Sequence, residues 1–416
     1  MTIFDIDYVR SQFPALGMKV SGHVAAFFDG PGGTQVPRRV MDAMSAYLAS
    51  SNANTHGAFA TSHRTDQVLA AAHGAMADLL GCAPAEIVFG PNMTTLTFAL
   101  SRALGRRLGP GDEIVVTRLD HDGNVSPWTA LAERGCVIRF VDINPADCTL
   151  DMDDLRAKVT ARTRVVAVGY ASNAVGTIND VEEVVRLAHA AGAMAYIDAV
   201  HYAPHGPINV RSLDCDFLVC SPYKFFGPHS GALYGKHEHL TRLAPYKVRP
   251  AADILPDRWE TGTQNHEGLA GVTAAVEYLA ELGRHHVPGA SSRRAAILAA
   301  YDAIRAYERS LVEHLVPGLL RVPGLTFYGI TDPMRFAQRV PTVAVRIAGR
   351  SPRELAGYLG ERGIFTWDGN YYALNLTERL GVEPSGGMLR VGLVHYNTAE
   401  EVERLLGALR ELAPRS

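Results

Sequence analysis

Residues 194–228 read MAYIDAVHYAPHGPINVRSLDCDFLVCSPYKFFGP. Two short apolar runs in this stretch, at 194–197 and 217–219, predict strands, and a polar residue follows each of them: Asp198 after the first and Lys224 after the second. A strand–helix–strand unit takes roughly 30 residues, which suits the interval between these two residues. The stretch therefore predicts neighbouring parallel strands of an α/β sheet.

The same alternation continues on both sides of this stretch. Further strands are predicted at four apolar runs, which are 87–89, 114–116, 137–141 and 165–168. Amphipathic segments such as 65–80 and 180–191 lie between strands and predict helices, the second with Asp180 as its N-cap. Because uninterrupted apolar runs suit strands covered on both faces, we expect an α/β fold with a mostly parallel, mixed sheet over residues 34–283.

The pattern changes in the last third of the chain. Residues 291–320 predict a long connecting helix that ends at Pro317-Gly318. Four elements are predicted after it: a strand at 342–347, a helix at 351–362, a strand at 388–394 and a helix at 398–412 that opens with a capping box. We expect three parts: an N-terminal segment (1–33) near the active site, a large domain (34–283), and a connecting helix with a smaller α+β domain (284–416).

Composition limits the possible partners of the chain. It has 416 residues, with 40 Lys and Arg against 43 Asp and Glu, so neither sign dominates and nucleic-acid or membrane binding is not expected. The five cysteines form no C-x-x-C pair, which argues against disulfides and a thiolate zinc site. The first residues contain no apolar h-region, so a secretory signal is not expected, and no run of 18 apolar residues occurs. These features predict a cytoplasmic protein.

Three polar residues predict the chemistry. Asn173, Asp198 and Lys224 are 25 and 26 residues apart, and each follows an apolar strand. In an open α/β sheet such strand ends form the ligand-binding edge. A lysine that can form a Schiff base and an aspartate that keeps a pyridine nitrogen protonated suit pyridoxal 5'-phosphate. The alternative for each residue alone is structural, with Asp198 capping a turn and Lys224 in solvent.

At this point the sequence resembles a known family. Segments 196–205 and 214–228 resemble the cofactor region of class V aminotransferase-fold enzymes, the fold-type I pyridoxal phosphate-dependent transferases. The resemblance is greatest to the cysteine desulfurase and selenocysteine lyase group. It extends from Phe28-Asp29-Gly30-Pro31 to the segment 390–398, RVGLVHYNT.

The resemblance implies roles for residues around the cofactor ring. Lys224 would form the Schiff base, and Asp198 would pair with the pyridinium nitrogen. His201, where many relatives have glutamine, would donate to the ring phenolate oxygen, with Asn173 nearby. His121 would stack on the ring and handle protons, which suits an imidazole.

The resemblance also places the phosphate group. The turn at 90–95 precedes a predicted helix, so Met93 and Thr94 would present main-chain N–H groups and a hydroxyl to the anion. Ser221 and Tyr223 would complete these contacts. Relatives usually have histidine at Tyr223, and a phenol can donate a hydrogen bond but brings no positive charge.

Two further residues extend the implied site. Thr263 matches a segment that reaches the phosphate of a neighbouring subunit, which implies a homodimer with shared active sites. Arg390 matches the arginine that binds the carboxylate of the amino-acid substrate, for which a planar guanidinium is well suited.

The sequence departs from the desulfurase pattern at one loop. In desulfurases a cysteine in this loop accepts sulfur as a persulfide, but here the loop is 363–373 and Tyr372 takes that position. A phenol cannot form a persulfide. We therefore predict a β-eliminating carbon–sulfur lyase acting on cysteine, cystine or an S-substituted cysteine, with Lys224 as the base. Trp367, Tyr371 and Tyr372 would form an aromatic substrate wall.

Other functions use the same residues. An aminotransferase or an amino-acid epimerase would need the same lysine, aspartate and arginine, and a non-catalytic binding or regulatory protein on this fold is the alternative from another class. The spacing Asp198-x-x-His201-x-x-x-His205 has metal-ligand residue types, but the cofactor explains His201 better, so no metal is expected. Neither a Walker motif nor a G-x-G-x-x-G motif after the first strand occurs.

Overall fold

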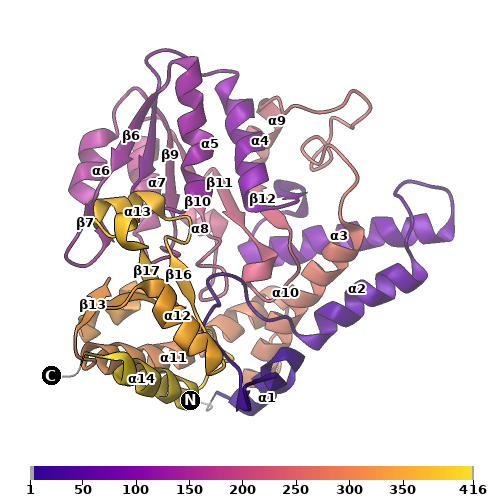
Figure 1. The fold of residues 1–416 in the computed structure, drawn as a ribbon. Helices are drawn as coiled ribbons and strands as arrows, with labels where there is room; N and C mark the ends of the chain where they lie inside the picture. The colour runs from indigo at the N-terminus through magenta and orange to yellow at the C-terminus, as the bar shows by residue number, and fades with distance from the viewer. Residues whose placement is uncertain (1–3, 415–416) are drawn as a thin grey trace.

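A seven-stranded sheet forms the centre of the larger part of the molecule (Figure 1). The computed structural model describes residues 4–414. In order across the sheet, the strands are β4 (Ile87–Gly90), β12 (Gly231–Gly235), β11 (Phe217–Cys220), β10 (Met194–Asp198), β9 (Thr163–Gly169), β5 (Glu113–Thr117) and β6 (Val137–Val141). Neighbouring strands are parallel except for the two pairs that β12 makes. The predicted α/β fold with a mostly parallel, mixed sheet is confirmed.

Both faces of this sheet are buried. Val166 and Val168 of β9 belong to the apolar core on one face, whereas Val165 and Ala167 belong to the core on the other. Helices α3 (Ala60–Leu80), α7 (Val181–Ala190) and α10 (His266–His286) contribute to the first core, and α4 (Met93–Gly105) and α5 (Ser126–Thr129) to the second. Alternate residues of one strand thus serve two cores, which explains the uninterrupted apolar runs.

Strand β12 was not predicted from the sequence. Its residues, Gly-Ala-Leu-Tyr-Gly, are bounded by glycines, which are rare in strands. Close packing explains the glycine at position 231, because a Cβ atom there would lie 2.4 Å from the carbonyl carbon of Asn92. The absence of a side chain therefore lets the start of α4 approach the sheet closely.

Two predicted helices have different bounds in the structure. The helix predicted at 65–80 begins earlier, at Ala60, and the long helix α11 (Arg293–Leu320) does not end at Pro317. Pro317 lies inside its last turn, so only three helical residues follow the hydrogen bond that its missing N–H group cannot make. Gly318 lies in the same turn and packs against Leu406, where a Cβ atom would lie 2.3 Å from that side chain.

The C-terminal part forms a second, smaller sheet (Figure 1). Its antiparallel strands are β13 (Leu325–Tyr328), β14 (Thr342–Ile347), β17 (Met388–Gly392) and β16 (Trp367–Gly369). Helices α11, α12 (Pro352–Glu361) and α14 (Ala399–Leu412) share a core with this sheet. The capping box at the start of α14 is confirmed.

The N-terminal segment packs against this smaller part. Strand β3 (Ala26–Phe27) pairs in parallel with β15 (Ile364–Phe365), and the chain then leads to Pro31 and Gly32. The boundaries predicted after residues 33 and 283 stay predictions.

The remaining elements are short or peripheral. They are α1 (Ile6–Ser11), α2 (Arg38–Ser50), α6 (Met152–Lys158), α8 (Val210–Leu213), α9 (His237–Arg242), α13 (Leu374–Arg379), β1 (Lys19–Val20), β2 (His23–Val24), β7 (Ile143–Asn144) and β8 (Thr149–Leu150). Within residues 4–414, no helix is both long enough and apolar enough to cross a bilayer.

Candidate active site

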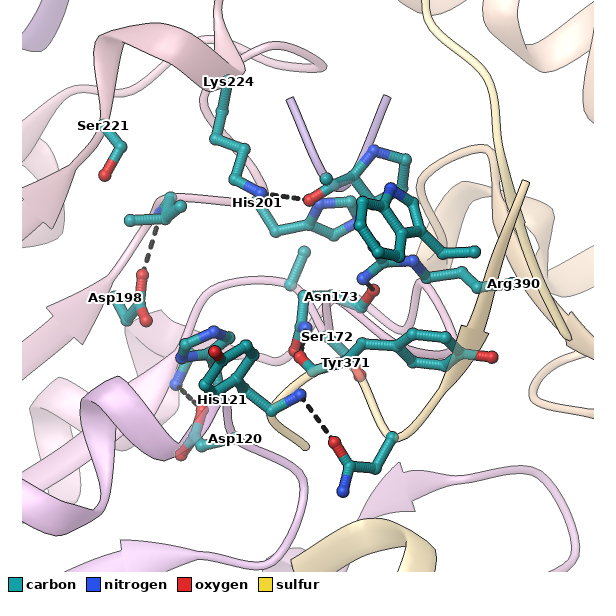
Figure 2. A pocket seen from close by; sticks show the side chains of 18 of the residues that line it. Asp120, His121, Ser172, Asn173, Asp198, His201, Ser221, Lys224, Tyr371 and Arg390 are labelled. Carbon is teal, nitrogen blue, oxygen red and sulfur yellow. Dashed lines mark hydrogen bonds between the residues drawn. The ribbon is translucent and has the colours of Figure 1, made fainter. Parts of the chain in front are cut away.

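A cavity of about 710 Å³ lies where the carboxyl ends of five strands of the large sheet meet the small sheet. Residues that follow β4, β5, β9, β10 and β11 line it, together with Arg390 of β17 and the loop after β16. Figure 2 shows side chains from these segments directed toward one another. The cavity brings together nearly all residues that the sequence selected, which are Met93, Thr94, His121, Asn173, Asp198, His201, Ser221, Tyr223, Lys224, Tyr372 and Arg390.

Lys224 ends a short 3-10 helix that follows β11. Its Nζ atom donates a hydrogen bond to the main-chain oxygen of Pro31 (Figure 2). Burial, and next the positive charge of Arg390, lowers the pKa of Lys224 to about 7, although Asp198 acts in the opposite direction. A substantial fraction of this amine is therefore uncharged near neutral pH and can attack a carbonyl carbon.

Asp198 is the last residue of β10 and is buried. Its Oδ1 atom accepts a hydrogen bond of 2.9 Å from the N–H group of Val200, while Oδ2 has no hydrogen-bond partner among residues 4–414. Burial raises the pKa of this carboxyl to about 6. A cationic N–H group in the cavity would stabilise the carboxylate, and a pyridinium nitrogen provides one.

His121 lies directly after the turn that follows β5. Its Nδ1 atom accepts a hydrogen bond of 2.9 Å from the N–H group of Gly123, so the neutral ring carries its proton on Nε2. Burial, and next the charge of Lys224, lowers the pKa of His121 to about 4. The imidazole is therefore neutral at pH 7. Its ring stacks on that of Tyr372, with centroids 5.3 Å apart.

His201 and Asn173 line the wall between the two sheets. His201 is buried, and its Nε2 atom lies 3.0 Å from the hydroxyl of Thr342 on β14. Asn173 donates from Nδ2 to the main-chain oxygen of Tyr371 at 2.9 Å, and its buried Oδ1 atom has no partner among the described residues. Asn173 therefore retains an unused acceptor at the cavity.

The start of α4 offers a site for an anion. Asn92 caps this helix by accepting from the N–H group of Thr95, which leaves the N–H groups of Met93 and Thr94 without partners inside the helix. The buried hydroxyl of Ser221 also lacks a partner among residues 4–414. Free amides at a helix N-terminus and an unused hydroxyl suit a phosphate group. Together with Asp198 and Lys224, these residues fit pyridoxal phosphate.

Arg390 enters the cavity from the centre of the small sheet. Its residue is only 4% exposed, and Nη1 donates to the main-chain oxygen of Asn173 at 2.9 Å (Figure 2). Burial lowers the pKa of Arg390 to about 10, so the guanidinium stays positively charged at neutral pH. A buried cation beside free space is suited to a substrate carboxylate.

Thr263 is the one site residue predicted from the sequence that does not line the cavity. It is exposed and lies in the segment between α9 and α10. Its expected contact is with a neighbouring subunit, so the role of Thr263 stays a prediction.

Asp120 is a buried cavity residue to which the sequence analysis assigned no role. It accepts hydrogen bonds from Thr117 Oγ1 at 2.7 Å and from Gly169 N at 2.5 Å. Burial raises the pKa of Asp120 to about 7. The signal that could have found it is its position, because it follows β5 just as Asn173 follows β9 and Asp198 ends β10.

The loop after β16 has an unusual backbone. Tyr371 and Tyr372 have φ values of 56° and 61°, a region in which a bulky residue costs about 1–3 kcal/mol. Two hydrogen bonds fix these residues: Asp122 N donates to Tyr372 O at 2.7 Å, and Asn173 donates to Tyr371 O. The Tyr372 side chain is 72% exposed at the cavity mouth.

No cysteine is among the residues that line the cavity. All five thiols are free; Cys136, Cys148, Cys215 and Cys220 are buried, and Cys82 is partly buried. Burial raises the pKa of each of them, to about 12 for Cys82 and Cys148. Cys215 and Cys220 belong to the apolar core beside strand β11.

Residues 26–405 match the sequence model of the class V aminotransferase family. The chain belongs to this family. It is 32% identical to a cysteine desulfurase of Pectobacterium atrosepticum, and the alignment covers 98% of both proteins. It is also 31% identical to a probable cysteine desulfurase of Mycolicibacterium paratuberculosis. That alignment covers 99% of this chain but only 58% of the longer relative.

Solved structures agree with this assignment to the class V family. The apo structure of a cysteine desulfurase from Thermococcus onnurineus NA1 superimposes with a TM-score of 0.87 at 27% identity, covering 99% of this chain and 98% of that one. The chain is thus a pyridoxal phosphate-dependent enzyme of the class V aminotransferase family. Among residues 4–414, no group of three or more His, Cys, Asp or Glu side chains is arranged to hold a metal ion.

Proposed function

We propose that this class V enzyme is a carbon–sulfur lyase that releases sulfur from cysteine, cystine or an S-substituted cysteine by β-elimination. The observation that carries the proposal is the loop after β16. A tyrosine pair is fixed there by hydrogen bonds to the large domain, and no thiol lines the cavity to receive sulfur. Elimination needs no protein thiol, because the sulfur leaves with its own substituent or as sulfide.

The positions of the site residues support the following roles. Arg390 binds the substrate carboxylate and orients Cα toward Lys224. The uncharged Nζ atom of Lys224 then takes the proton from Cα, and the bond between Cβ and sulfur breaks with its electron pair on sulfur. His121 carries a proton on Nε2 near the cavity and can give it to the leaving thiolate. Water then converts the released aminoacrylate into pyruvate and ammonia.

Other residues hold the cofactor. Asp198 would pair with the ring nitrogen, His201 and Asn173 would lie near the ring oxygen, and the start of α4 with Ser221 and Tyr223 would hold the phosphate. When bound, pyridoxal phosphate withdraws electrons from Cα and makes its proton acidic. The aromatic side chains at the mouth favour a substrate larger than free cysteine.

The experiment is a product assay with the purified holoenzyme. Cysteine, cystine, S-methylcysteine and S-benzylcysteine are offered in turn, and pyruvate, ammonia and released thiol are measured. The proposal expects equal amounts of pyruvate and ammonia from at least one substrate. Conversion of the cofactor to its amine form without pyruvate would instead indicate an aminotransferase, and deuterium incorporation at Cα without loss of substrate would indicate an epimerase.

We also infer a homodimer and a cytoplasmic location. Six large apolar side chains are exposed on α2, at the start of α3 and in the segment that contains Thr263; they are Met41, Leu48, Phe59, Tyr246, Val248 and Ile254. Figure 1 shows α2 and α3 projecting from the rest of the molecule. Exposed apolar side chains of this kind favour an interface with a second subunit. The free state of all five cysteines favours a reducing compartment.

A further inference from the structure

A second cavity, of about 490 Å³, lies on the other side of the wall that contains His201. Tyr170 and Asn179 from the large domain line it, as do residues of α11 and the segment before β14. His205 faces this cavity, and its ring meets that of His201 with centroids 5.5 Å apart. The two histidines therefore separate the second cavity from the active site.

Three buried polar atoms of residues that line this cavity have no hydrogen-bond partner among residues 4–414. They are Oδ1 of Asn179, Oε1 of Glu308 and Nε of Arg339. The three residues are 6%, 3% and 6% exposed. Because unpaired buried polar atoms are rare in folded proteins, three at one cavity indicate that something polar binds there.

Arg339 supplies a positive charge without a counter-ion. Its Nη2 atom donates to the main-chain oxygen of Thr342 at 2.6 Å and Nη1 donates to that of Ile330, so these donors meet neutral carbonyl groups. Within residues 4–414 no carboxylate pairs with it, and burial lowers the pKa of Arg339 to about 9. A buried cation normally has an anionic partner. The exposed Arg305 lines the same cavity.

Glu308 supplies a buried carboxyl group. Burial raises the pKa of this group, and the neighbouring His205 acts in the opposite direction. Its Oε2 atom lies 2.9 Å from His205 Nδ1, and its Oε1 atom and Asn179 Oδ1 are both acceptors without a donor. The rings of Tyr170 and Tyr202 also line the cavity and stack with centroids 3.9 Å apart. The lining thus combines an unused cationic donor, two unused acceptors and an apolar ring surface.

We propose that this second cavity binds a small zwitterionic amino acid. Its carboxylate pairs with Arg339 and its ammonium group with Glu308 and Asn179, while its side chain lies against the two tyrosines. Occupancy acts on the active site through His205 and His201, a step that rests on the cofactor contact proposed for His201. The site is therefore regulatory and distinct from the carboxylate site at Arg390.

The test uses holoenzyme reduced with borohydride, in which the cofactor stays joined to Lys224 and the amine of a probe cannot replace that bond. L-alanine, L-methionine and L-phenylalanine are titrated by calorimetry, with acetate and ethylamine as probes that carry only one charge. We expect saturable binding of at least one amino acid at one site per chain, and binding of acetate and ethylamine at least tenfold weaker. Absence of binding, or equal binding of acetate, would overturn the proposal.

Variants locate the binding. Ala306 is exposed on α11 and lines the cavity, so Ala306→Trp should fill the space and abolish binding, whereas Ala306→Ser should leave it unchanged. Arg305→Gln should weaken binding at least threefold, and Arg321→Gln, outside the cavity, should not. If Ala306→Trp binds as the parent does, the proposal is wrong. The lyase proposal is tested by pyruvate release and this proposal by calorimetry. A negative pyruvate assay would therefore not change the interpretation of the binding results.

Discussion

The guanidinium carbon of Arg390 lies 4.4 Å from the centre of the Tyr371 ring. Tyr371 itself is fixed at both ends, because Asn173 holds its main-chain oxygen and its hydroxyl donates to the main-chain oxygen of Met388. Asn173 also accepts from Arg390. The left-handed backbone of Tyr371 therefore serves to hold the arginine in place for a carboxylate.

The first prediction concerns this contact. Tyr371→Leu removes the ring that lies against Arg390, and a cation–π contact is worth about 1–2 kcal/mol, so we expect KM for the amino acid to rise about tenfold with a smaller change in kcat. Tyr371→Phe keeps the ring and should stay within about threefold of the parent. Steady-state kinetics of pyruvate release measure both values. An equal fall in kcat for the two variants would contradict a positioning role.

Alkylation tests the absence of a reactive thiol. Because the five cysteines lie outside the cavity and their thiol pKa values are raised, iodoacetamide should leave pyruvate release nearly unchanged. Tyr372→Cys places a thiol at the mouth and should make the enzyme sensitive. Rapid inactivation of the parent protein, with protection by substrate, would show that a thiol takes part.

The pKa of Lys224 predicts the pH dependence of cofactor attachment. Only the uncharged amine attacks the cofactor aldehyde, and the pKa of Lys224 is lowered to about 7. The rate constant for attachment to the apo chain should therefore rise about tenfold per pH unit below pH 7 and level off above it. Stopped-flow absorbance measures this rate. A rate that still climbs tenfold between pH 8 and pH 9 would fit an ordinary lysine and would contradict the burial effect.

Ser221→Ala separates a ligand contact from a structural one. The Ser221 hydroxyl has no partner in the described chain, so its removal should not lower the free energy of unfolding of the apo protein. Hydrogen bonds to charged groups contribute about 1.5–3 kcal/mol, so the Kd for pyridoxal phosphate should rise at least tenfold. Denaturant unfolding and cofactor titration are compared on the same variant. Loss of apo stability with unchanged cofactor affinity would assign the hydroxyl to packing.

Mixed subunits test the shared site. Thr263→Tyr should block the phosphate site of the neighbouring subunit, and Lys224→Ala removes the attachment point in its own subunit. If each site uses both chains, refolding the two inactive variants together should restore about a quarter of the parent activity, since half of the dimers are mixed and each has one intact site. Activity no higher than the sum of the two variants would contradict the shared site.

Much of this site could be predicted from the sequence because its residues follow strands. Asn173, Asp198 and Lys224 each follow an apolar run, and parallel strands bring their carboxyl ends to one edge. Asp120 also follows a strand, β5, and lines the cavity, but the sequence analysis assigned a role only to its neighbour His121. The strand at 231–235 was missed because its glycines serve close packing, which only the tertiary structure reveals.

The second cavity could not be predicted from the sequence. Asn179, Glu308 and Arg339 come from three distant segments, and each alone is an ordinary polar residue of a helix or loop. Their common feature is an unpaired buried atom, which depends on the packing of α11 and β14 against the large domain. Periodicity and spacing carry no information about such packing.

The pairing of β3 with β15 has a consequence for biosynthesis. Residues 26–27 acquire their partner only when residues 364–365 have been made, and this pairing brings Pro31 to Lys224. Ala26 and Phe27 of the nascent chain therefore lack their strand partner through most of translation, while the large domain can already fold. The cavity closes last, so a truncated product of a stalled ribosome would contain the lysine but lack the enclosure that makes it reactive.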